Sequence, residues 1–139
     1  MGREVAERFI GPVQSRDADA LMELFAEDAV LHHPLSSEPI RGKAAIGENE
    51  QALFDSFSDI DIEVLRVVSE GDDMALELVV RATNTGPLDV GADEKLPPTG
   101  RRIELPSVWF LTLGADGKIV EKRDYVDTAG LFRQLGLAS

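Results

Sequence analysis

The chain has 139 residues, with 26 Asp and Glu against 14 Lys and Arg and no cysteine, so its formal net charge is −12. Residues 1–100 hold 21 of the acids and 8 of the bases, and the rest of the chain is almost neutral. This length predicts a single domain over residues 1–139, with one core and room for a ligand-sized pocket. The acidic field argues against nucleic acid and anionic membrane surfaces as partners. Without cysteine there is no disulfide, no thiolate nucleophile and no cysteine metal site.

The sequence carries no sign of export or membrane insertion. No apolar run approaches the ~20 residues of a membrane-spanning helix, and residues 1–20 lack the apolar core of a signal peptide. We therefore expect a cytoplasmic protein.

Apolar residues at helical spacing predict three helices in the first part of the chain, over residues 4–15, 17–26 and 43–57. Pro12 lies inside the first of them and favours a kink or an early end there. Asp17 is the expected N-cap of the second. A short strand over residues 29–33, stopped by Pro34, separates the second helix from the third.

Alternating apolar and polar residues then predict four strands, over residues 59–69, 74–83, 101–113 and 118–127. Between the second and third strands, residues 84–100 show no period and read either as a lid over a pocket or as a solvated insertion. Pro106 lies in the middle of the third strand and predicts a bulge or a sheet edge near Ser107. Asp127 or Thr128 is the expected cap of a last short helix that stops at Gly136. Helices followed by a run of strands indicate an α+β fold.

Four segments, ELFAEDAVLHHPLSSEPIRGKAAI, PPTGRRIEL, GKIVEKRDYVD and LFRQLG, follow one another along the chain. In this order and spacing the chain resembles the nuclear transport factor 2-like superfamily, and within it the SnoaL-like polyketide cyclase and limonene-epoxide hydrolase branches. The resemblance runs from about Val5 to Leu137. It implies a cone, in which a curved, mixed or antiparallel sheet wraps around three N-terminal helices, with a short C-terminal helix and a deep pocket. It also implies a homodimer. This fold hosts isomerases, cyclases, hydrolases and non-catalytic binders, so it specifies the reaction far less than the architecture.

Asp124 is the first candidate for a catalytic residue. The segment RDYVD resembles the motif in which epoxide hydrolases of this family carry a catalytic carboxylate, and that carboxylate corresponds to Asp124. Strand alternation puts Lys122, Asp124 and Val126 on one face. A carboxylate walled by apolar side chains suits general acid–base catalysis. The alternative is a surface or rim salt bridge of Asp124 with Lys122 or Arg101.

His33 is the second candidate. In ketosteroid isomerase a similar segment reads EDP and its Asp is the general base, and the HHP of this chain puts His33 at that place. His32 and His33 are neighbours on a strand and point to opposite faces, so a two-histidine metal site is not expected. A dyad of His33 with Asp124 is the sharpest hypothesis. The alternative is a capped or solvent-facing histidine beside Pro34.

Two departures from the family patterns matter. Epoxide hydrolases of this family need an Arg and an Asp two residues apart on the third strand, whereas ELVVRAT offers Glu77 and Arg81, which we expect to face outward. Phe9 and Trp109 fall where ketosteroid isomerase has its oxyanion-binding Tyr and acid. Neither the epoxide-hydrolase mechanism nor the ketosteroid-isomerase mechanism can therefore be carried over in full to this chain.

The expected substrate-binding residues are apolar, with ordinary core packing as the alternative for each: Phe9, Leu31, Phe54, Leu78, Leu105, Trp109 and Val126. With Asp124 and His33 as its candidate catalytic residues, the resemblance implies a general acid–base enzyme, cyclase/isomerase-like or epoxide-hydrolase-like, that acts on a small, largely apolar molecule. No cofactor and no metal are expected, and no phosphate-binding glycine motif is present in the sequence. The alternative function is a non-catalytic ligand-binding or dimerisation module of the same fold.

Overall fold

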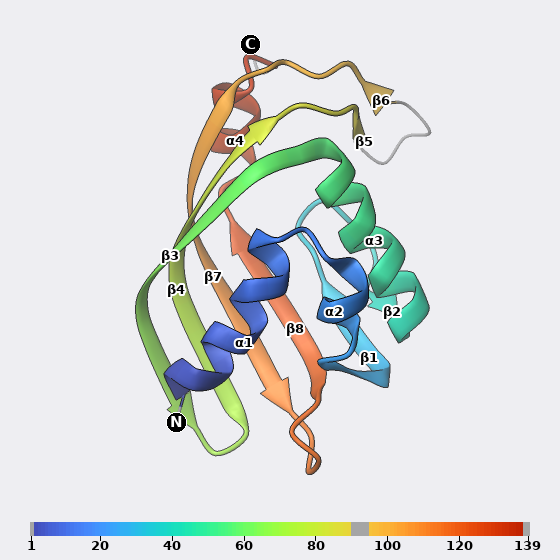
Figure 1. Ribbon diagram of the computed structural model, residues 1–139, viewed down its shortest axis with the longest axis vertical. Coiled ribbons are helices and arrows are strands. Elements are labelled where there is room, and N and C mark those ends of the chain that lie inside the picture. The colour runs from blue at the N-terminus through green and yellow to red at the C-terminus, as the bar shows by residue number, and fades with distance from the viewer. Residues whose placement is uncertain (1, 90–94, 138–139) are drawn as a thin grey trace.

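The computed structural model describes residues 2–89 and 95–137. Its helices are α1 (Gly2–Gln14), α2 (Ala18–Met22), α3 (Lys43–Ser56) and α4 (Thr128–Gln134). Its strands are β1 (Phe25–His32), β2 (Ile40–Arg41), β3 (Phe57–Glu70), β4 (Asp73–Asn84), β5 (Leu88–Asp89), β6 (Lys95–Leu96), β7 (Arg102–Leu113) and β8 (Ile119–Val126). The predicted α+β class is confirmed, and Figure 1 shows the first three helices on one side of the long strands.

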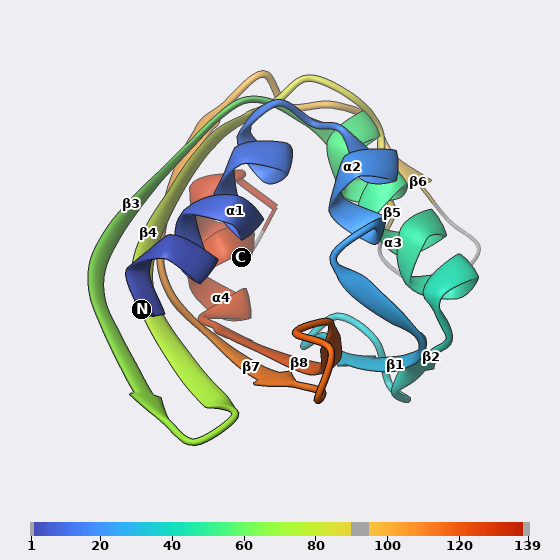
Figure 2. The ribbon, with the colours of Figure 1, turned by 60° about the horizontal axis from the view of Figure 1, so that its bottom comes forward.

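Six strands form one curved, unclosed sheet in the order β2-β1-β8-β7-β4-β3. From β8 to β3 the neighbours are antiparallel, whereas β1 pairs parallel with β8, so the sheet is mixed. Figure 2 shows α1, α2 and α3 within the curve of the sheet. This arrangement is the cone that the resemblance implies. The pair β5 and β6 forms a small separate sheet.

The first long strand begins earlier than the sequence predicts. Periodicity extends the second helix to Ala26, but α2 ends at Met22 and β1 begins at Phe25. The reason is a long-range pairing: Phe25 lies opposite Ile119 of β8, and the Leu24 carbonyl accepts the Ile119 N–H at 2.8 Å. The two-residue β2, which pairs with β1, is too short to give any period in the sequence.

The helix ends agree with the capping residues expected from the sequence. Asp17 and Asp127 each accept a hydrogen bond from the backbone N–H three residues further on, at 3.0 and 2.9 Å, and so cap α2 and α4. Gly136 follows α4 with φ +75°, which suits glycine. The helix α1 continues through Pro12 and ends at Gln14. None of the helices in residues 2–89 and 95–137 has the length and apolar character needed to cross a membrane.

Pro106 lies inside β7 without a bulge. The strand β8 ends at Val126, opposite Ser107, so β7 residues before Ser107 have only β4 as a described neighbour in the sheet. The register of β7 with β4 is continuous through Pro106, which lies opposite Val79. The predicted local edge is present and the predicted bulge is not, because a proline at an edge needs no ladder hydrogen bond on its open side.

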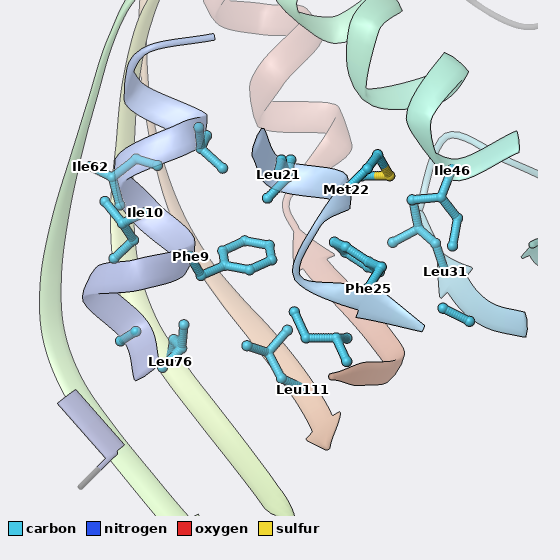
Figure 3. Packing of buried hydrophobic residues seen from close by; sticks show 14 of the residues in the cluster. Phe9, Ile10, Leu21, Met22, Phe25, Leu31, Ile46, Ile62, Leu76 and Leu111 are labelled. Atoms are coloured by element: carbon cyan, nitrogen blue, oxygen red, sulfur yellow. The ribbon is translucent and has the colours of Figure 1, made fainter. Parts of the chain in front are cut away.

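The core is divided into two clusters. The first lies among α1, α2, β1 and the middle of the sheet, where Figure 3 shows Ile10 of α1 beside Ile62 of β3 and the Phe9 ring pointing toward Phe25. The second lies near α4 and includes Phe57, Leu88, Ile103, Leu105 and Leu131. A cavity inside the cone borders both clusters.

The described part of the segment 84–100 is anchored to the body of the protein. The buried Asn84 side chain donates to the Ser56 and Gly86 carbonyls, each at 3.0 Å, and accepts the Thr99 N–H at 2.8 Å. Leu88 is buried in the second cluster. Of the two interpretations that the sequence leaves open, a solvated insertion does not fit this part of the segment, since Leu88 forms part of the interior wall.

Candidate active site

A cavity of about 150 Å³ lies inside the cone, and fifteen of the twenty residues that line it are apolar. Five of the seven residues expected to bind substrate are among them: Phe9, Phe54, Leu105, Trp109 and Val126. Leu31 and Leu78 are not; both are fully buried in the first core cluster. Their inward direction was predictable from alternation, but their neighbours fill the space in front of them. The polar residues at the cavity are His33, Glu50, Ser107, Lys122 and Asp124.

Asp124 reaches the cavity from β8, on the same face as Lys122 and Val126, as alternation predicts. Its side chain is 10% exposed and that of Lys122 is 4% exposed, and the Lys122 Nζ donates to Asp124 Oδ1. The salt bridge that stood as the alternative to a site therefore exists, but it lies inside the cavity and not on the surface. Each charge offsets the loss of hydration of the other.

Aromatic rings hold the Lys122 ammonium from the other side. Its Nζ lies 4.6 Å from the centre of the Trp109 ring and 5.6 Å from that of Phe9. The two rings meet edge to face, with centres 5.5 Å apart. Such contacts with a desolvated cation contribute up to about 2 kcal/mol each. Lys122 is thus fixed between two rings and one carboxylate, which fixes the position of Asp124 in turn.

His33 follows the last residue of β1 and its side chain is 13% exposed. The Leu35 N–H donates to its Nδ1 at 3.2 Å. Because Nδ1 accepts, the neutral ring carries its proton on Nε2, which lies 4.0 Å from Asp124 Oδ2. Burial lowers the pKa of His33 from 6.5, against the Asp124 carboxylate, which raises it, while the Lys122 ammonium adds to the lowering. The imidazole is therefore neutral near pH 7.

His33 and Asp124 thus face one cavity, as the dyad hypothesis requires, but without a direct hydrogen bond. Their separation of 4.0 Å exceeds the ~2.6–3.2 Å of a hydrogen bond. His32 points away, as predicted, and its Nε2 lies 3.0 Å from Glu121 Oε2. Within the described residues, no three His, Cys, Asp or Glu side chains are grouped as metal ligands.

Glu50 is a cavity residue that the sequence reasoning missed. It lies on α3 between Ile46 and Phe54, at a spacing of four residues from each, and all three are buried. Burial raises the pKa of Glu50 to about 7; the Lys122 ammonium acts against this rise, and the Asp124 carboxylate adds to it. The signal was present in the sequence, since a single acid within an apolar helical stripe is unusual.

The residues that distinguish epoxide hydrolases of this fold are absent from the cavity. Glu77 and Arg81 alternate with the inward-facing residues of β4 and form ion pairs on the outer face, Glu77 with Arg66 at 3.2 Å and Arg81 with Glu104 at 2.8 Å. The described residues that line the cavity include no arginine. The expectation that these two side chains face outward is confirmed.

The fold and the cavity define a class of protein, the nuclear transport factor 2-like cones with polar groups in an apolar interior. The chain belongs to the SnoaL-like polyketide cyclase family, whose model matches residues 3–135.

Solved structures with the same fold include TsrD from Streptomyces laurentii, with 21% identity, a TM-score of 0.80 and coverage of 97% of this chain and 94% of that one. SalBIII, described as an epoxide hydrolase/cyclase-like enzyme in pyran ring formation in the polyether salinomycin, has 25% identity and a TM-score of 0.73, covering 90% and 89%. An LEH-like epoxide hydrolase of M. tuberculosis has 18% identity and a TM-score of 0.70, covering 95% and 86%.

Proposed function

We propose that the protein is a cofactor-independent enzyme that moves a proton on a small, largely apolar substrate bound in the cavity. The observation that carries the proposal is the buried Asp124 carboxylate, which faces an apolar space beside His33 and is paired with Lys122. A carboxylate held out of bulk water next to a bound molecule is an effective general base. The neutral His33 offers its Nε2–H as a hydrogen-bond donor to a substrate oxygen.

Among the reactions open to this family, we favour proton removal from a carbon beside a carbonyl, as in isomerisation or aldol-type cyclisation. Epoxide opening is less well supported, because Glu77 and Arg81 lie on the outer face and the described lining has no arginine. The similarity to SalBIII, a protein described as acting in ring formation, supports a ring-forming reaction.

The cavity also limits the size of the substrate. An engineered apolar cavity of about 150 Å³ admits benzene, and this one measures about 150 Å³. We therefore propose that one ring, or one end of a longer molecule, enters the cavity. The apolar walls bind the hydrocarbon part, and His33 and Asp124 act on the polar part.

The test begins with ligand discovery. One-ring ketones, terpenoid epoxides and polyketide-like esters are screened for a rise in the thermal midpoint, because a ligand of the folded state raises it. Turnover of each hit is then measured with the wild type, with Asp124→Asn and with Asp61→Asn, a matched change at an exposed position of β3.

We expect Asp124→Asn to lower turnover at least about 100-fold while the rise in midpoint persists, and Asp61→Asn to leave turnover unchanged. Near wild-type turnover of Asp124→Asn would eliminate the role of Asp124. Binding without any turnover by the wild type would favour the non-catalytic ligand-binding module.

Homodimer formation remains a prediction. Leu65, Phe110 and Tyr125 are large apolar residues exposed on the outer face of the sheet, which makes that face the place to test it. Light scattering of the wild type and of Tyr125→Lys measures the mass of each in solution, and a monomeric wild type would contradict the prediction.

A further inference from the structure

Glu50 is a buried titratable group of the cavity to which the proposed function gives no role. The residue is 7% exposed, and it lines the cavity together with Asp124, Lys122 and His33. Among the described residues its carboxyl has neither a hydrogen bond nor an ion pair within 4.0 Å. A carboxylate without a close partner is costly to bury, so the protonated form of Glu50 is favoured in this interior.

We propose that Glu50 is the catalytic acid of this site, giving its proton to the substrate oxygen while the Asp124 carboxylate takes a proton from carbon. The inference rests on the proposed function, because it assigns the second proton of the same reaction. Its geometric basis is that both carboxyl groups and the Lys122 ammonium face one apolar space, from α3 on one side and from β8 on the other.

Three of the polar groups at the cavity have distinct proton-transfer roles. Asp124 is paired with a buried ammonium and is the proton acceptor. His33 carries its proton on Nε2 and is neutral, so it donates a hydrogen bond but is a poor source of a proton. Glu50, whose pKa burial raises to about 7, is protonated below neutral pH and releases its proton near it. Two carboxyl groups in different environments, one paired with an ammonium and one held by apolar surroundings, are a usual basis for assigning the base and the acid.

The step balances as a keto–enol conversion. An Asp124 oxygen takes the proton of the carbon next to the carbonyl, and the electron pair of that C–H bond forms a C=C bond. The π electrons of the carbonyl move to its oxygen, which takes the proton from Glu50. Asp124 is then a carboxylic acid, Glu50 a carboxylate and the substrate an enol, and the reverse transfers return a proton to carbon and regenerate both groups.

With Lys122 present, the total charge of Asp124, Glu50 and Lys122 stays the same during the transfer. Before the step, the Asp124 carboxylate balances the Lys122 ammonium and Glu50 is neutral; after it, the negative charge lies on Glu50. The sum over the three groups is zero in both states. The Lys122 charge acts on Glu50 as well as on Asp124, so the displaced negative charge keeps an opposite charge near it in a medium of low dielectric.

The first test needs no substrate. With glutamate labelled at the side-chain carboxyl carbon, ¹³C NMR titrations of the wild type and of Glu50→Gln identify the Glu50 signal as the one that disappears. We expect that signal to titrate with a midpoint near 7, because burial raises the pKa of the Glu50 carboxyl to about 7. A midpoint at the ordinary value of 4.5 would overturn the proposal.

The second test follows loss of the α-proton signal of cyclohexanone in D₂O by NMR, over a range of pH. The wild type should accelerate exchange and lose rate above neutral pH, where Glu50 is ionised. Glu50→Gln should be slower at least about 100-fold and should lack that decline. Glu48→Gln, the same change at an exposed position of α3, should behave as the wild type.

The outcomes separate the two proposals. If Glu50→Gln keeps the rate and the pH profile of the wild type while Asp124→Asn loses exchange, the role of Glu50 is refuted and the proposed function stands. If the wild type does not accelerate exchange at all, the carbonyl chemistry that both proposals assume is refuted, and the assignment of Glu50 as its acid with it.

Discussion

The two parts of the core use similar apolar side chains but leave different amounts of space. In the first cluster Leu21, Leu31 and Leu76 are fully buried among close neighbours. Near α4, Leu105 and Leu131 border a cavity of about 150 Å³. The two most deeply buried titratable residues of the described chain, Glu50 and Lys122, both line that cavity. The packed part therefore positions the site, because its Phe9 ring contacts the Lys122 ammonium, while the open part leaves space for a substrate.

The comparison predicts unequal costs for equal truncations. Leu76→Ala in the packed cluster should lower the free energy of unfolding by about 2–5 kcal/mol, because the new void cannot collapse. Leu105→Ala should cost less, since its side chain already faces empty space and has fewer neighbours to lose. Urea unfolding of the two variants measures both values. Equal losses of unfolding free energy in the two variants would mean that side chains fill the cavity in solution and that Leu105 is packed as closely as Leu76.

Glu50 should make the cavity region less stable as pH rises. Its pKa is raised by burial from 4.5 to about 7, so the folded chain holds the proton more tightly than the unfolded chain. Its contribution to stability is complete below pH 4.5 and is lost as pH rises through about 7, a change on the order of 3 kcal/mol. The free energy of unfolding of Glu50→Gln, measured with urea, should therefore rise relative to that of the wild type as pH increases over this range. Glu48→Gln is the control, and a gain of the same kind there would contradict the assignment.

His33 should act in the opposite direction. Its pKa is lowered from 6.5, chiefly by burial, so the unfolded chain takes up a proton that the folded chain resists. The wild type should lose stability as pH falls below 6.5, and His33→Gln should lack this part of the loss. Urea unfolding at several pH values measures it. His32→Gln on the outer face is the matched control; the prediction fails if the two variants respond alike.

The two helix caps give the smallest expected effects. Asp17→Ala and Asp127→Ala should each cost about 1 kcal/mol, because each removes one cap from a short helix. Only Asp127→Ala should also weaken the binding of a ligand in the cavity, because α4 contributes Leu131 to the cavity wall. Urea unfolding and the ligand-induced rise in the thermal midpoint separate the two effects. A loss of binding in Asp17→Ala would show that the packed part also shapes the cavity.

The sequence patterns predicted the features that depend on neighbouring residues, namely the faces of the strands and the caps of the short helices. Alternation gave the faces of β3, β4 and β8, and so put Asp124 beside Lys122 and Val126; the two caps followed from the position of single aspartates. The end of α2 and the existence of β2 depend on pairing with strands distant in the sequence, which no local period records.

The site was harder to predict than the strands. Leu31 and Phe9 are both apolar and inward, yet only Phe9 borders the cavity, because the space in front of each depends on side chains from other elements. The helical spacing of α3 could have predicted that Glu50 is buried with Ile46 and Phe54. Its position across the cavity from Lys122 and Asp124 depends on the folded arrangement of α3 and β8, which the local pattern does not record.

The position of Trp109 has an optical consequence. It is the one tryptophan of the chain, and it lies at the cavity with the Lys122 ammonium 4.6 Å from its ring centre. The one tyrosine, Tyr125, lies on the outer face. Fluorescence excited where only tryptophan absorbs therefore originates entirely within the site, and its wavelength responds to the charge and polarity beside the indole. The unlabelled protein thus contains its own reporter of what enters the cavity.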